Sequence, residues 1–229
     1  MGTLLLRIAG PMQSWGSESK FETRRTDAMP TKSGIIGLLA AALGWKRDAS
    51  LEELNALRFG VRADQPGHTT YDFQIARYQK TKKNTEAYLT YRYYIEDGIF
   101  LVGLESDNID FLRKLEYAVR HPVFHLFLGR RSYVPTQPIS LGIRDENLEL
   151  SLRNESWLAP SWRQSHERAY LEMQIEAKNA DQAMFVKHDQ PQSFNPYRRR
   201  YSERGVYIDH FLIEDSHYTE HDIFSELDK

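Results

Sequence analysis

The sequence predicts an α+β fold because strand and helix signals alternate along its first 140 residues. Four apolar runs, each short enough for a strand, lie at residues 3–8, 59–63, 99–104 and 124–128. Two stretches with helical signals separate them, at residues 35–43 and 108–120. The resulting order is strand, helix, strand, insertion, strand, helix, strand. This order is typical of a ferredoxin-like (RRM-like) core, which we expect over residues 1–140.

The helices carry start and stop signals. The apolar run from Ile35 to Leu43 ends at Gly44, and Ser33 is the expected N-cap. In the later helix the predicted buried stripe consists of Phe111, Leu112, Leu115 and Val119. A shorter helix is expected from Ser50 to Leu57, with Ser50 and Glu53 as a capping box.

The insertion, about residues 66–96, is expected to form an extended β-hairpin, which we call the thumb. Between residues 71 and 95, seven aromatic residues are interleaved with Arg77, Lys80, Lys82, Lys83 and Arg92. Aromatic rings can stack on nucleobases while cations pair with phosphates. The alternative is a tyrosine-rich strand pair that packs on its neighbours.

Residues 141–229 are expected to form a small β-rich region with an acidic tail. Strands are predicted at residues 148–152, 171–177 and 205–213, with a polar turn at 189–195. From Asp209 to Lys229 seven acids accompany one base, so this tail carries −6 and the preceding 208 residues carry +4, although the net charge is −2. The uneven distribution indicates either a basic face for phosphate or a set of solvated loops.

Composition limits the chemistry. The absence of cysteine excludes disulfides, thiolate metal sites and cysteine nucleophiles, and fits a cytoplasmic location. No apolar run approaches the ~20 residues that span a bilayer, and no signal peptide is expected. His217 and His221 match an H-x-x-E-H zinc pattern, but they lie in the acidic tail, so we expect neither a metal nor a cofactor.

Two segments are candidate phosphate sites. Gly129-Arg130-Arg131-Ser132 follows an apolar run; its glycine permits close approach, and its arginines are planar donor forks for phosphate or base edges. The alternative is that these arginines pair with acids at a turn. Thr31, Lys32 and Ser33 precede a helix whose free N–H groups suit phosphate, or they simply cap a core helix.

Taken together, several segments resemble the CasD, or Cas-five-type, family of subunits of the type I-E CRISPR Cascade complex. The resemblance lies in residues 6–16, 21–26 and 30–39, and again in residues 127–132 and 135–139, all in family order. It implies a ferredoxin-like core with a thumb that grips the 5′ handle of the guide RNA and caps the complex. It also implies two protein partners, a Cas-seven-type backbone subunit and the large Cascade subunit, with target DNA reached through guide pairing.

The residues expected to contact RNA are basic, polar or loop-forming, with one aromatic. They are Gln13, Trp15, Arg24, Arg25, Thr31, Lys32, Ser33, Lys82, Lys83, Arg92, Gly129, Arg130, Arg131 and Ser132.

Two other functions remain open from the sequence. A type I-C branch of the family cuts precursor RNA with a lysine and a histidine near the thumb. Here Lys82 and Lys83 have no neighbouring histidine, and the nearest is His68. Lysine alone is a poor general base at neutral pH, so we expect a protein that binds RNA without cutting it. The third possibility is a structural subunit that contacts only proteins.

Overall fold

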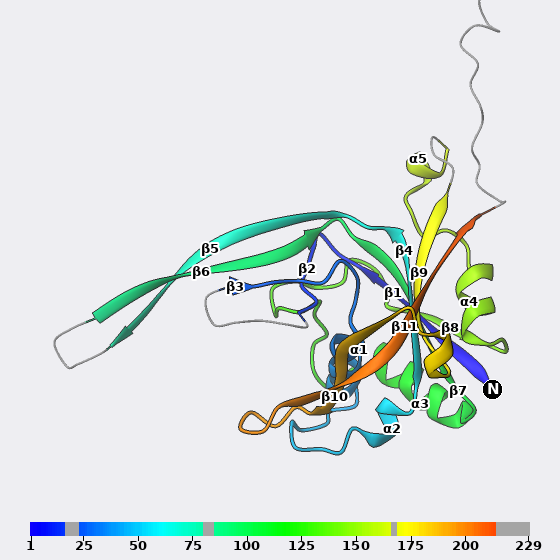
Figure 1. Cartoon of the computed structure of the whole chain (residues 1–229), viewed down its shortest axis with the longest axis horizontal. Helices are drawn as coiled ribbons and strands as arrows, with labels where there is room; N and C mark the ends of the chain where they lie inside the picture. The colour runs from blue at the N-terminus through cyan, green and yellow to red at the C-terminus, as the bar shows by residue number, and fades with distance from the viewer. Residues whose placement is uncertain (17–22, 80–84, 166–168, 214–229) are drawn as a thin grey trace, which may run out of the picture.

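The structure is a computed structural model, and it describes residues 1–16, 23–79, 85–165 and 169–213. Its body is built on a sheet in the order β10-β11-β9-β4-β7-β1-β8, in which all neighbours are antiparallel. These strands are β1 (Gly2–Ala9), β4 (Arg58–Gln65), β7 (Ile99–Ser106), β8 (Ser140–Arg144), β9 (Tyr170–Glu176), β10 (Phe185–Ser193) and β11 (Arg200–Leu212). Strands from the last third of the chain therefore continue the sheet begun by the first (Figure 1).

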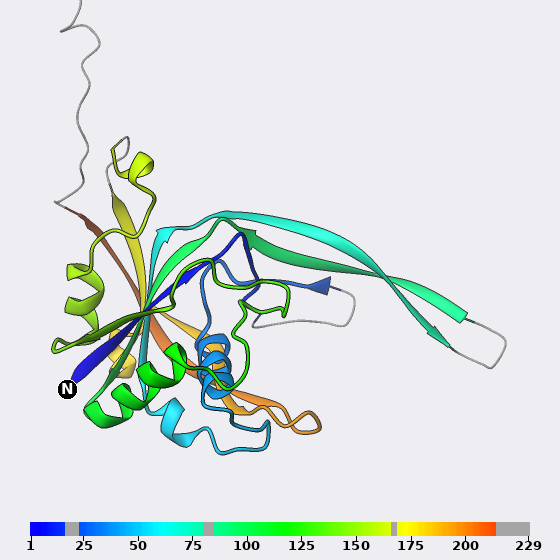
Figure 2. The same cartoon turned by 180° about the vertical axis from the view of Figure 1, so that it is seen from behind.

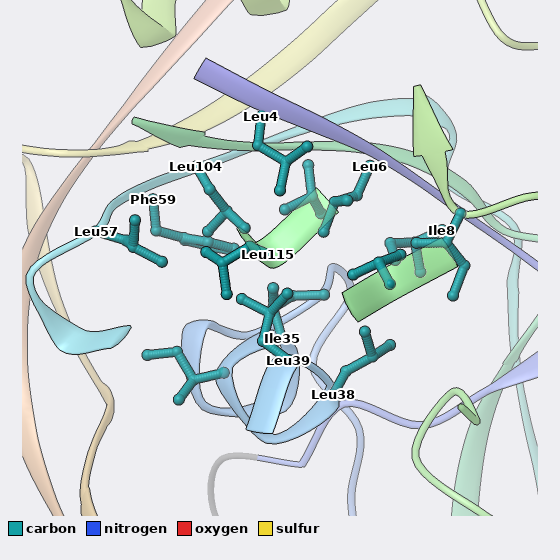
Figure 3. Close-up of a cluster of buried hydrophobic side chains, with 14 of the residues drawn as sticks. Leu4, Leu6, Ile8, Ile35, Leu38, Leu39, Leu57, Phe59, Leu104 and Leu115 are labelled. Atoms are coloured by element: carbon teal, nitrogen blue, oxygen red, sulfur yellow. The ribbon is translucent and has the colours of Figure 1, made fainter. Parts of the chain in front are cut away.

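The sheet buries side chains on both faces. Because side chains alternate along a strand, Leu4, Leu6 and Ile8 of β1 point to one face and Leu5 to the other. On the first face they meet α1 (Lys32–Ala42) and α3 (Ile109–Arg120), whose Ile35, Leu39 and Leu115 complete the cluster in Figure 3. On the second face Leu5 packs with α4 (Leu148–Asn154). The predicted stripe of α3 is buried as expected.

The predicted thumb is present. Strands β5 (His68–Gln79) and β6 (Thr85–Glu96) pair along their whole length and extend far from the body (Figures 1 and 2). Near the body, β6 also pairs with the two-residue strands β2 (Met12–Gln13) and β3 (Thr23–Arg24). Lys80, Lys82 and Lys83 lie outside the described residues. The other short elements are α2 (Glu52–Asn55), α5 (Ser161–Gln164) and the 3₁₀ turn η1 (Ala180–Gln182).

Two strand predictions were wrong. Residues 124–128 form no strand: after Pro122, the N–H groups of Val123 and Phe124 donate to the carbonyls of Ala42 and Ala41 at the end of α1 (3.0 and 3.3 Å). The place beside β1 is taken by β8 instead. Residues 148–152 are helical. Their leucines alternate as in a strand, but the Asn147 side chain caps a helix by accepting from the Leu150 N–H at 2.9 Å.

Three finer predictions also need correction. Helix α1 begins at Lys32 rather than Ile35, and its N-cap is Thr31, whose hydroxyl accepts from the Gly34 N–H, rather than Ser33. Helix α2 begins at Glu52 after Leu51. The Ser50 hydroxyl accepts from the Glu52 N–H at 3.4 Å, but among the described residues Glu53 returns no bond, so the predicted capping box is only half formed. Most of the predicted turn at 189–195 belongs to β10, which lasts to Ser193.

An ion pair between β4 and α4 makes stability depend on pH. The Arg58 guanidinium donates to both oxygens of Glu149 at 2.9 and 2.6 Å, and the Tyr207 hydroxyl donates at 3.0 Å. Partial burial alone would raise the pKa of Glu149, but the hydrogen bonds from Arg58 lower it from 4.5 to about 2. A depressed carboxyl pKa adds stability that is fully present above pH 4.5 and is lost as the pH falls towards 2.

We therefore expect Glu149→Gln to flatten the acid side of the stability profile. Between pH 6 and pH 3 the melting temperature of the variant should fall less than that of the parent, because glutamine does not titrate. Thermal unfolding followed by circular dichroism across this range measures the difference. Parallel profiles for parent and variant would contradict the assignment.

Candidate nucleic-acid interface at the base of the thumb

Strand β6 brings two of the expected arginines together. Its Tyr91 and Arg92 pair in parallel with Thr23 and Arg24 of β3, so Arg24 lies directly beside Arg92. Partners in a ladder point to the same face of a sheet. Arg25 follows at the end of β3 and is exposed. Arg24 and Arg92, from two distant segments, thus lie side by side where the thumb leaves the body, and Arg25 is the next residue along the chain.

The Gly129–Ser132 loop closes against the same place. The Leu128 N–H donates to the Tyr133 carbonyl at 2.7 Å, and the Tyr133 N–H donates to the Arg130 carbonyl at 2.9 Å, which makes a tight turn. The Ser14 N–H ties this turn to the segment after β2 by donating to the Leu128 carbonyl at 3.1 Å. Gly129 has φ +92°, and a Cβ there would lie 2.1 Å from the Ser14 carbonyl oxygen, so the turn requires glycine.

Tyr94 links the loop to β6. The Arg130 guanidinium lies over its ring at 4.7 Å from the centroid, and Tyr133 meets the ring edge to face at 5.3 Å. Burial raises the pKa of Tyr94 to about 12, so the phenol stays neutral at physiological pH. Because Arg92 and Tyr94 are two residues apart in a strand, they share a face, and Arg130 joins Arg92 and Arg24 there.

We call these five residues the thumb-base cluster: Arg24, Arg25, Arg92, Arg130 and Arg131. Asp72 is the residue opposite Arg92 on β5 and is the acid that offsets part of the charge. The Nε of Arg92 is buried and has no hydrogen-bond partner among the described residues. Arg131 and Ser132 are exposed. The cluster presents a concentrated positive charge on a fixed backbone.

Gln13 and Trp15 are buried rather than placed along a groove as we had expected. The Gln13 amide donates to the Gly98 carbonyl at 2.6 Å and accepts from the Trp15 indole N–H at 3.0 Å. The indole packs so closely on α1 that a Cβ at Gly34 would lie 2.7 Å from it. These two side chains support the thumb base from below, where they cannot reach a ligand at the surface.

The hydrogen-bonding groups of Thr31, Lys32 and Ser33 already have partners within the protein. The Lys32 N–H donates to Asp189 at 2.9 Å, and its buried ammonium pairs with Glu176, also at 2.9 Å. The Ser33 hydroxyl contacts that of Thr31 at 3.3 Å. A phosphate is therefore not needed at this helix start, and a carboxylate already occupies it. The acids lie 157 and 144 residues further along the chain, which is why the sequence could not reveal them.

The thumb carries an aromatic face that sequence reasoning anticipated only in outline. Alternation along β5 and β6 places on one face five large side chains that are 40–61% exposed: Tyr71, Phe73, Ile75, Leu89 and Tyr91. Two of them lie close to each other, with the Tyr71 and Tyr91 ring centroids 6.3 Å apart. Tyr94 and Tyr133, which shape the arginine site, were missed as site residues, and only the aromatic enrichment of the segment pointed to Tyr94.

Other chemistry has little support among the described residues. His68 is exposed at the body end of β5, while Lys82, Lys83, His217 and His221 lie outside the described part of the chain. Within the described ranges, no three His, Cys, Asp or Glu side chains are close enough to hold a metal ion. In the same ranges, no helix combines the length and apolarity required to cross a bilayer.

Comparison with known proteins decides the family. A family model described as CRISPR-associated protein (Cas_Cas5) matches residues 3–207. The chain belongs to the Cas5 family of CRISPR-associated proteins. A relative of this Cas5 protein is the CRISPR system Cascade subunit CasD of Escherichia coli (strain K12), 36% identical over 156 residues, which cover 61% of this chain and 70% of the relative. The resemblance found in the sequence is thereby confirmed.

Two solved structures resemble this Cas5 protein over nearly its whole length. A chain of a CRISPR RNA-guided surveillance complex superposes with a TM-score of 0.75 at 28% identity, covering 98% of this chain and 97% of that one. A structure titled Crystal structure of Cas protein gives a TM-score of 0.72 at 35% identity, with 96% and 98% covered.

Proposed function

We propose that this Cas5 protein is a non-catalytic, RNA-binding subunit of a type I-E Cascade complex, which grips the 5′ handle of the guide RNA and caps one end of the assembly in the cytoplasm. The observation that carries the proposal is the thumb-base cluster. Arginine is suited to this role because its guanidinium is always charged and offers a planar fork of donors to phosphate oxygens. The fixed Gly129 turn lets these donors bind RNA with little further ordering.

The fold supports the same proposal. The strands β4-β7-β1-β8, with α1 and α3 on one face, follow the strand order of a ferredoxin-like core, the arrangement that RNA-recognition modules use. In an RNA-guided complex the protein need read only RNA shape and backbone, because target DNA is recognised through pairing with the guide.

The thumb supplies a surface for the other expected partners. Its exposed aromatic face, defined by Tyr71, Phe73 and Tyr91 with two aliphatic neighbours, suits stacking on splayed bases and packing on the Cas-seven-type backbone subunit. The large Cascade subunit would adjoin the body.

The thumb-base proposal predicts the effect of Arg130→Ala/Arg131→Ala. Handle RNA should bind more weakly, and the slope of log affinity against log salt should become shallower by roughly 1.4, because two phosphate contacts are lost and each contributes about 0.7 on a single strand. Anisotropy of a labelled handle RNA across several salt concentrations measures both values. The control is Arg113→Ala/Lys114→Ala on exposed positions of α3, which removes the same charge elsewhere.

Unchanged affinity together with an unchanged slope in the double variant would refute the thumb-base site. The non-catalytic part has its own test, because a nuclease of this family needs no metal. Steady cleavage of repeat RNA by the purified chain in EDTA would replace the proposal with the endoribonuclease alternative.

A further inference from the structure

A second projection leaves the body on the same side as the thumb. Strands β10 and β11 form a hairpin that extends past the sheet, and in both views it points in the direction of β5 and β6 (Figures 1 and 2). Its connecting residues, 194–199, belong to neither strand. We call residues 197–200 the arm tip; they are Tyr197, Arg198, Arg199 and Arg200.

The arm is anchored beneath its tip. Phe194 packs on α1, where a Cβ at Gly37 would lie 3.7 Å from its ring, and the Asn55 amide of α2 donates to the Pro191 carbonyl at 2.6 Å. Lys187 of β10 pairs with Asp27 at 3.5 Å. These contacts hold the arm against the helices, so its tip has a defined position relative to the body.

The backbone of the tip is also fixed. The Asn195 side chain accepts from the Tyr197 N–H at 2.9 Å, and the Arg198 N–H donates to the Asn195 carbonyl at 3.1 Å. The Asn195 N–H in turn donates to the Ser193 hydroxyl at 3.1 Å. Such an Asx turn presents the following side chains outwards in a set arrangement.

The tip side chains do little for the fold. Tyr197 is 95% exposed, the highest value among the large hydrophobic residues that the structure describes as exposed. Arg198, Arg199 and Arg200 are exposed and form no ion pair with any described residue. The acid nearest along β10, Asp189, is already bonded to Arg204. Three cations and one ring are therefore held on a firm base without a partner in the described chain.

We propose that the arm tip is a second binding site for single-stranded nucleic acid, separate from the thumb-base cluster. Tyr197 stacks on an unpaired base, and the three arginines bind the adjoining phosphates. A lone exposed ring needs an unstacked base, which favours a single strand over a duplex. The strand can be the guide RNA or a strand of opened target DNA, since both offer a base and a phosphodiester chain.

The first test uses the full-length chain with an oligo(U) RNA and an oligo(dT) DNA of about 16 nucleotides. Arg198→Ala/Arg199→Ala/Arg200→Ala should lower the salt slope by about 2, because three phosphate contacts at about 0.7 each are lost. Tyr197→Ala should weaken binding roughly tenfold and leave the slope unchanged, while Tyr197→Phe should bind as the parent does. A triple control, Arg113→Ala/Lys114→Ala/Arg120→Ala on α3, removes the same charge. A tip triple variant indistinguishable from this control would overturn the proposal.

The second test identifies the strand in the assembled complex purified with its guide. Ultraviolet cross-linking at Tyr197 before target DNA is added assigns the tip to the guide RNA, and a cross-link that appears only after DNA binding assigns it to DNA. A cross-link to neither refutes the site. The inference rests on the proposed function only in assuming that the bound strand comes from a guide RNA or its target. The arm-tip site and the thumb-base site can therefore be refuted separately. Loss of binding in the tip variants but not in Arg130→Ala/Arg131→Ala would remove the thumb-base site and leave the arm tip.

Discussion

Replacing Asp189 by alanine is expected to lower the free energy of unfolding by about 3–5 kcal/mol, the usual cost of removing one partner from a buried ion pair. The Asp189 carboxylate is fully buried and accepts from Arg204 Nε at 2.6 Å, Arg204 Nη2 at 3.0 Å and the Lys32 N–H at 2.9 Å. Burial would raise the pKa of Asp189, but the hydrogen bonds from Arg204 outweigh it and lower the pKa. The group is therefore an anion in the folded protein.

The effect is large because the alanine leaves a buried cation behind. The Arg204 side chain is 4% exposed, and its Nη1 already lacks a hydrogen-bond partner among the described residues. Nearby, burial lowers the pKa of the Lys32 ammonium, and Glu176 opposes this. Together these charges fasten the start of α1 to β9, β10 and β11, so the change loosens the joint between distant parts of the chain.

Urea denaturation at neutral pH measures the loss of unfolding free energy. The comparison requires that the dependence of this free energy on urea concentration has the same slope in parent and variant. The matched control is Asp209→Ala in β11. Asp209 also pairs with an arginine, Arg153, but the two side chains are 34% and 39% exposed, so the loss should stay below about 1 kcal/mol. Equal losses of unfolding free energy in the two variants would show that burial does not set the contribution of the Asp189 ion pair to stability.

The same network shows what a sequence can and cannot reveal. Local periodicity predicted β1, β4, β7, α3 and the thumb, because each depends on neighbours within a few residues. The partners of Lys32 lie 144 and 157 residues away, so a lysine at a helix start looked like a phosphate ligand. The leucines at 148–152 fit both the alternation of a strand and the spacing of a helix. The Asn147 cap favours the helix. A short apolar run such as 124–128 is ambiguous for the same reason.

For the candidate site, residue types were easier to predict than their arrangement. The Gly129–Ser132 loop and Arg92 were selected from separate segments, and their juxtaposition depends on β6 pairing with β3 and on Arg130 lying over Tyr94. Gln13 and Trp15 stood in the right segment but face inwards. Whether the arginines bind RNA stays a prediction, and the turn that positions them offers a direct way to disturb it.

Gly129→Ala is expected to reduce handle binding roughly tenfold, about the loss from one charge-assisted hydrogen bond, and to cost more stability than Gly142→Ala. Both glycines have positive φ, +92° and +97°, so each alanine carries the same left-handed backbone cost of about 1–2 kcal/mol. They differ in what the new Cβ would meet. At Gly142 the nearest atom is Arg144 Nη1 at 3.3 Å, the end of a flexible side chain, whereas at Gly129 it is the Ser14 carbonyl oxygen at 2.1 Å.

Because backbone cannot yield as a side chain can, Gly129→Ala must displace the turn itself. Arg130 then moves off the Tyr94 ring, and Arg131 moves with it, while both guanidinium groups remain in the protein. Handle-RNA anisotropy and urea denaturation of the two glycine variants separate the effect of where the arginines lie from the effect of their charge. If both variants bind RNA equally well and unfold at the same urea concentration, the close approach to Ser14 does not set the site. If only Gly129→Ala loses affinity, the position of the arginines matters as well as their charge.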